Sequence, residues 1–122
     1  MIKLTFALTR LPSLSREEFQ AYWYDHHAPL VASVRETLGI RRYVQMHSLP
    51  AEASAQLRAS RGGPEGYDGV AQLWYDSLET LGGLMQKPEA QAAARLLLED
   101  ERKFIDLPKS PLWWGQERVI FD

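Results

Sequence analysis

The first segment of the chain alternates between apolar and polar residues. Its apolar positions are Ile2, Leu4, Phe6 and Leu8. A period of two is typical of a β-strand with one buried face. Residues 40–49 and 67–75 have a similar β-leaning character, and 113–121 is expected to form a closing strand.

Helical spacing begins after the first strand. Ser15 and Glu18 have the spacing of a capping box, so a helix is expected to start there. Four-residue spacing places three large rings on one face of this helix: Phe19, Trp23 and His27. Pro29 predicts a break at 27–28 and a second helix that ends at 38–39.

The second half of the chain repeats this order. Ser77 is expected to cap a helix that is interrupted at Gly82, Gly83 and Pro88, and residues 89–105 have the strongest helical pattern. Residues 50–64 are interpreted as an excursion between two strands, with a helical part at 51–60, rather than as a linker between domains.

The order strand, helix, strand, strand, helix, strand predicts one domain over residues 1–122. It fits an α+β fold, a ferredoxin-like sandwich with a four-stranded antiparallel sheet and helices on one face. Within the second strand Tyr43 and His47 face one way, and Val44 and Met46 face the other. An uncovered face of this content implies pairing with a second copy, a homodimer.

Composition excludes several function classes. The 122 residues carry 14 Lys and Arg against 16 Asp and Glu, a formal net charge of −2 that argues against nucleic acid or an acidic membrane as partner. With no cysteine, disulfides, thiolate nucleophiles and cysteine metal sites are excluded. No signal peptide or apolar run of about 20 residues is visible, so a cytoplasmic protein is expected.

His27 is the main candidate for chemistry. Burial among aromatic rings favours a neutral imidazole, which suits general acid–base work near neutral pH. The alternative is a structural histidine that binds a carbonyl freed by the helix break. Asp68, at the start of a strand, could orient a histidine, although a turn cap is favoured. Asp25, His26 and His27 are adjacent and point about 100° apart in a helix, so no metal site is expected.

The aromatic residues are the next feature, with four Trp, five Tyr and four Phe. Most must lie in the core, but those on separate elements could also wall a flat apolar pocket: Tyr22, Trp23, Tyr43, Trp74 and Trp113. His47 could line a cavity or the dimer seam, and the seam is favoured. The acidic run 99–101 is interpreted as a solvated face.

Four motifs resemble the EthD family of dimeric α/β barrels. The first is Phe19-x-x-Tyr22-Trp23-x-x-x-His27-Ala28-Pro29-Leu30-Val31, followed by the segments 67–76, 99–106 and 117–122. The resemblance implies a ferredoxin-like protomer whose sheet pairs with that of a second copy, and a pocket between sheet and helices. His27 matches the family's histidine.

The leading hypothesis is a cofactor-independent lyase or isomerase that acts on a small hydrophobic aromatic, polyketide-like or lactone substrate. In this hypothesis His27 transfers the proton, and Tyr67 and Asp68 orient either His27 or the substrate. Trp23 and Trp74 would form the wall of the pocket. Three alternatives stay open: a non-catalytic protein that binds an apolar metabolite for a partner enzyme, a haem-using monooxygenase, and a purely structural dimer. Whether the segment 50–64 covers the pocket as a lid also stays open.

Overall fold

An antiparallel four-stranded sheet forms the centre of the protein in a computed structural model that describes residues 1–122. The strands are β1 (Ile2–Leu8), β2 (Arg42–His47), β3 (Gly69–Tyr75) and β4 (Leu112–Gly115). Their order across the sheet is β2-β3-β1-β4, so the chain crosses over rather than running through neighbours. The predicted ferredoxin-like α+β fold is confirmed.

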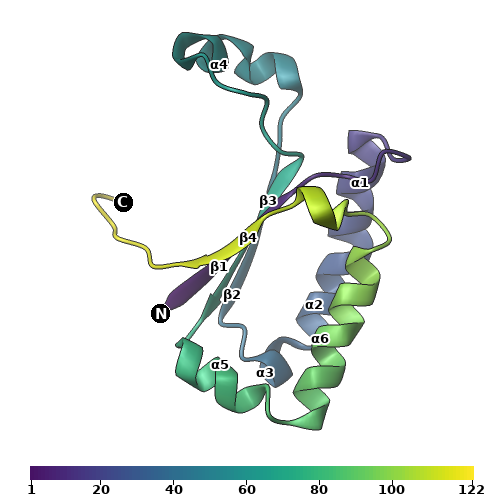
Figure 1. The fold of residues 1–122 in the computed structure, drawn as a ribbon, viewed down its shortest axis with the longest axis vertical. Coiled ribbons are helices and arrows are strands. Elements are labelled where there is room, and N and C mark those ends of the chain that lie inside the picture. Colours follow the sequence, from purple (N-terminus) through teal and green to yellow (C-terminus); the bar gives the residue numbers. More distant parts are fainter.

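The helices lie on one face of this sheet (Figure 1). They are α1 (Arg16–Tyr22), a π-helical turn (Trp23–His27), α2 (Ala28–Ser33), α3 (Arg35–Leu38), α5 (Leu78–Leu84) and α6 (Pro88–Glu101). Ser15 caps α1 with the predicted capping box, since its side chain accepts from Glu18 N and Glu18 bonds back to Ser15 N. None of the helices is both long and apolar enough to span a bilayer.

Two segments extend away from the body in Figure 1. One is the arm, residues 50–66, which holds a 3₁₀ turn (Ala51–Ser54) and α4 (Ala55–Arg61). The other is the C-terminal segment 116–122, where Phe121 is 90% exposed. The predicted closing strand 113–121 is therefore too long, because only residues up to Gly115 pair with β1. A second 3₁₀ turn, Leu107–Lys109, precedes β4.

The strand register assigns each side chain to a face. Leu4 lies opposite Leu73, and Tyr43 also pairs with Leu73, so these residues face the helices. Alternate positions form the outer face: Lys3, Thr5, Ala7, Arg42, Val44, Met46, Val70, Gln72, Trp74 and Trp113. The predicted division of Tyr43 and His47 from Val44 and Met46 is confirmed.

Trp23 joins the helix layer to the sheet. Its side chain is 1% exposed and packs against Phe19 with ring centroids 5.6 Å apart. On the sheet side its ring lies directly against the bare backbone of Gly69. A Cβ at residue 69 would overlap the Trp23 ring and lie 2.9 Å from the carbonyl oxygen of Met46. Glycine is therefore required for this close approach.

We expect Gly69→Ala to lower the free energy of unfolding by about 1–3 kcal/mol, the usual effect of overpacking a filled core. Urea denaturation monitored by far-UV circular dichroism measures this change. Gly66→Ala is the matched control, because a Cβ there would meet no atom within 4 Å. Equal stability of the two variants would show that Trp23 does not depend on the bare backbone.

Candidate active site

The helix that carries His27 is continuous where a break was predicted. Residues Trp23–His27 form a π-helical turn, and Ala28 N donates to the carbonyl of Trp23 five residues earlier. The wider turn lets the chain pass Pro29 without ending the helix, because the bonding pattern already departs from the i→i−4 ladder. Trp23 and His27, four residues apart, both reach the space between helices and sheet.

His27 is fixed by a carboxylate from the neighbouring helix. Its Nδ1 lies 2.8 Å from Oδ2 of Asp100 in α6, and the two side chains are 7% and 10% exposed. Because an ionised carboxylate only accepts, Nδ1 carries the proton and Nε2 keeps its lone pair. Nε2 has no hydrogen-bond partner. Because every fully buried side-chain nitrogen or oxygen has a partner, Nε2 is not fully buried, and His27 lines the cavity between helices and sheet.

Tyr22 completes this network. Its hydroxyl donates to the other Asp100 oxygen, Oδ1, over 2.6 Å, and Lys103 Nζ lies 3.7 Å from the same oxygen. Burial would raise the pKa of Asp100, but the hydrogen bonds from Tyr22 and His27 hold it below its ordinary value. Burial and the Asp100 contact raise the pKa of Tyr22 to about 12.

Burial lowers the pKa of His27 below its ordinary value, against the pull of the Asp100 carboxylate. The ring of Phe104 lies 5.0 Å from the imidazole and contributes to this apolar environment. At neutral pH the pair is therefore a neutral imidazole beside an ionised carboxylate. That combination orients a histidine for proton abstraction at Nε2.

Asp100 is the residue that the sequence interpretation missed. The acidic run 99–101 was expected to be solvated, but Asp100 is only 8% exposed. The buried side of α6 follows the spacing Ala90, Ala93, Leu97 and Asp100, and Phe104 continues this spacing just beyond the helix. A carboxylate on this apolar stripe is a signal that could have identified it.

An apolar cavity of about 120 Å³ lies between helices and sheet at His27. We call it the His27 cavity; its lining residues are Leu4, Phe6, Leu8, Trp23, His27, Val31, Tyr43, Ala71, Leu73, Tyr75, Leu97, Glu101, Ile105 and Leu112. Glu101, like Asp100, was expected in solvent. Burial and the Asp100 charge raise the pKa of Glu101 to about 7.

The predicted pocket aromatics separate into two groups. Trp23 and Tyr43 line the His27 cavity, and Tyr22 lies behind it on Asp100. Trp74 and Trp113 lie on the outer face of the sheet and cannot wall this cavity. The Trp74 ring lies between Lys3 and Arg42, 5.2 Å and 4.6 Å from its centroid, and its Nε1 donates to Glu117. The proposed wall at Trp74 and Trp113 is thus corrected by the strand register.

His47 and His26 have local partners. His47 points to the helix side, where its ring packs 4.5 Å from that of Trp23 and its Nε2 lies 2.7 Å from Gln45 Oε1. His47 therefore does not lie on the outer face of the sheet, and its placement at a dimer seam stays a prediction. His26 is exposed and stacks on Tyr22 at 5.0 Å. No group of three histidine or acidic side chains is placed to hold a metal ion.

Asp68 binds two arginines and makes no hydrogen bond to His27. Its carboxylate accepts from Arg10 N at 2.8 Å, Arg10 Nη1 at 2.5 Å and Arg16 Nε at 3.1 Å. Burial would raise the pKa of Asp68, but these donors lower it. Asp68 thus ties the β1–α1 connection to the start of β3, and Asp100 occupies the position beside His27 that was considered for Asp68.

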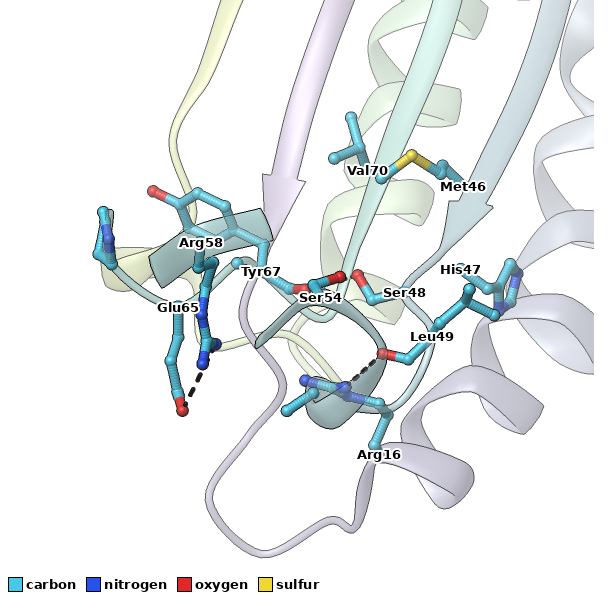
Figure 2. A pocket seen from close by; sticks show the side chains of 13 residues that line it. Arg16, Met46, His47, Ser48, Leu49, Ser54, Arg58, Glu65, Tyr67 and Val70 are labelled. Atoms are coloured by element: carbon cyan, nitrogen blue, oxygen red, sulfur yellow. Dashed lines mark hydrogen bonds and ion pairs between the residues drawn. The ribbon is translucent and has the colours of Figure 1, made fainter. Parts of the chain in front are cut away.

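Tyr67 borders a second hollow, the arm cavity, of about 520 Å³ between the arm and the outer face (Figure 2). Tyr67 is 43% exposed there. Arg16 Nη1 donates to the Leu49 carbonyl over 2.9 Å, and Arg58 lies 3.8 Å from Glu65. Met46 and Val70 belong to the outer face, so the arm does not lid the His27 cavity within one chain.

A profile of the EthD domain matches residues 11–108, most of the chain. The protein belongs to the EthD domain family. Across 111 residues it is 28% identical to the dehydratase ustZ of Ustilaginoidea virens, covering 87% of this chain and 76% of that protein.

Two solved structures share this ferredoxin-like fold. An EthD family protein of Bacillus halodurans superimposes with a TM-score of 0.60 at 22% identity, covering 97% of this chain and 100% of that one. A dimeric protein of unknown function with a ferredoxin-like fold, from Bacteroides fragilis, superimposes with a TM-score of 0.58 at 10% identity, covering 95% of both chains. The EthD match includes His27 and Asp100 but ends before β4.

In this EthD domain we expect Asp68→Asn to lower the free energy of unfolding by about 2–3 kcal/mol, typical of losing a hydrogen-bonded charge. The substitution weakens the tie between two arginines and β3. Thermal and urea unfolding measure the change. Asp76→Asn, which removes an exposed pair with Arg41, is the control and should cost less than about 1 kcal/mol. A loss no larger than the control's would contradict the anchoring role.

Proposed function

We propose that this EthD domain is a cofactor-independent lyase or isomerase of dehydratase type, in which His27 is the general base. The observation that carries the proposal is the free Nε2 of a buried imidazole in an apolar cavity, with Nδ1 held by Asp100. The name of its relative, dehydratase ustZ, supports the same reaction class. His27 would remove a proton from a carbon next to a carbonyl group.

The cavity limits the substrate. Apolar residues make up 12 of its 14 lining residues, which favours an aromatic, polyketide-like or lactone ring over a charged metabolite. An engineered apolar cavity of about 150 Å³ binds benzene. A cavity of about 120 Å³ therefore encloses about one ring at the reacting end, and the volume is too small for a haem macrocycle. This favours proton transfer over the haem alternative.

We expect His27→Gln to lower turnover by about 10²–10⁴-fold, the usual contribution of one general base. Two probes test the reaction class: the benzaldehyde–acetone aldol adduct, which dehydrates to benzylideneacetone, and the unsaturated α-angelica lactone, which isomerises. Both are followed by ultraviolet absorbance. His26→Gln is the control, because His26 is the neighbouring but exposed imidazole.

Unchanged turnover in His27→Gln would contradict the mechanism. If wild-type protein binds benzylideneacetone, measured by quenching of tryptophan fluorescence, but converts neither probe, then a non-catalytic binding role is favoured instead. The turnover measurement thus tests His27 as the base, and the binding measurement tests whether the cavity takes up an aromatic ligand.

We also infer that two copies pair through the outer face. Met46 and Trp113 are large apolar side chains, 51% and 52% exposed, on a sheet face that no helix of the same chain covers. The B. fragilis structure, described as dimeric, has the same fold.

We expect Met46→Glu to shift the protein from dimer to monomer, because a carboxylate would be buried without a partner. Sedimentation equilibrium measures the mass. Leu96→Glu is the control: Leu96 is 46% exposed on α6, in the helix layer away from the outer face. A dimer that persists in Met46→Glu and dissociates in Leu96→Glu would place the interface on the helices.

A further inference from the structure

Glu101 is the acidic group of the His27 cavity that the proposed base mechanism does not use. It is the last residue of α6 and directly follows Asp100. Adjacent helical residues point about 100° apart. Asp100 therefore binds Tyr22 and His27 behind the cavity, while Glu101 lines the cavity itself beside His27.

The Glu101 carboxyl group has no hydrogen bond and no ion pair. The nearby cations are already engaged, since Arg102 pairs with Glu99 at 2.5 Å and Lys103 lies 3.7 Å from Asp100. An unpaired ionised carboxylate among apolar side chains is costly, whereas a neutral carboxylic acid is tolerated far better. No fully buried polar atom is left unpaired, so the Glu101 oxygens keep some accessible surface, and Glu101 is one of the residues that line the cavity.

Several titratable groups face Glu101. His27 comes from the π-helical turn, Tyr43 from β2 and Tyr75 from β3, and all three line the same cavity. Burial, and then the Glu101 charge, raise the pKa of Tyr75 to about 12, so both tyrosines stay neutral. On its own helix Asp100 raises the pKa of Glu101 and Arg102 lowers it. The result, about 7, keeps the acid form populated at neutral pH.

We propose that Glu101 is the proton donor of the site: its carboxyl group delivers a proton to the oxygen that leaves the substrate, while His27 takes a proton from the neighbouring carbon. The inference rests on the proposed function. A base alone would have to expel hydroxide, a poor leaving group, into an apolar cavity. An acid that lines the same cavity converts this group to water.

The step balances within the site. The C–H bond breaks and its proton binds to Nε2 of His27, its electron pair forms the C=C bond, and the C–O bond breaks as the oxygen receives the Glu101 proton. The products are an unsaturated carbonyl compound and one water molecule. His27 is then protonated and Glu101 ionised, and transfer of the His27 proton to Glu101 through water restores both.

The test compares two leaving groups on one carbon skeleton: the benzaldehyde–acetone aldol adduct and its acetate ester. Acetate leaves without a proton, whereas hydroxide requires one. We expect Glu101→Gln to lower turnover of the hydroxy ketone by about 10²–10⁴-fold and that of the acetoxy ketone only a few-fold. His27→Gln should lower both. Glu99→Gln, on an exposed side chain of the same helix, should lower neither.

The pH profile gives a second signature. The wild-type rate on the hydroxy ketone should fall above pH 7 as Glu101 ionises, and it should fall at low pH as His27 becomes protonated. In Glu101→Gln the alkaline limb should vanish. Equal loss on both ketones, or an alkaline limb that persists, would overturn the role of Glu101 and leave His27 as the base.

A binding experiment tests Glu101 even if the wild-type protein converts neither ketone. Benzyl alcohol carries the same oxygen next to an aromatic ring but cannot eliminate. We expect the infrared difference between wild type and Glu101→Gln at pH 6 to show a protonated carboxyl band that benzyl alcohol shifts to lower frequency. A band that is absent, or that benzyl alcohol does not move, would overturn the inference independently of turnover.

Discussion

The contact between the Trp23 ring and the bare backbone of Gly69 is the constraint on which the rest of the structure depends. It sets how closely the helix carrying the site approaches the first residue of β3. Because Gly69 pairs with Leu8 and with His47, the same contact fixes the distance to three strands at once. The His27 cavity is the space that remains beside this contact, where smaller side chains such as Ala71 leave the sheet unfilled.

Burial acts in opposite directions on the ionisable groups of the site. It lowers the pKa of His27, which favours the neutral imidazole near pH 7, and it raises the pKa of Glu101 to about 7, so that the neutral acid is populated there. Asp100 stays ionised because Tyr22 and His27 donate to it. Two acidic residues that are adjacent in sequence therefore differ in protonation: Asp100 has hydrogen-bond donors that offset its burial, whereas Glu101 has none and also experiences the Asp100 charge.

The sheet, the helix order and the start of the first helix could be predicted because they depend on local periodicity. Alternation from Ile2 to Leu8 and the capping box at Ser15 are properties of neighbouring residues. The site depended on information that periodicity lacks. Alternation shows that Trp74 and Tyr43 occupy opposite faces only when the register between β2 and β3 is known. Asp100 could be assigned to His27 only through the packing of two helices that are distant in sequence.

The π-helical turn has a consequence for the length of the first helix. A π turn holds one residue more than an α turn, so the segment after Trp23 is rotated relative to the segment before it. If the same residues formed a regular α-helix instead, every residue from His27 onward would be turned by about 100° relative to α1, the rotation of one residue. The imidazole would then face away from Asp100. The contact between His27 and Asp100 therefore depends on the one extra residue that the π turn holds.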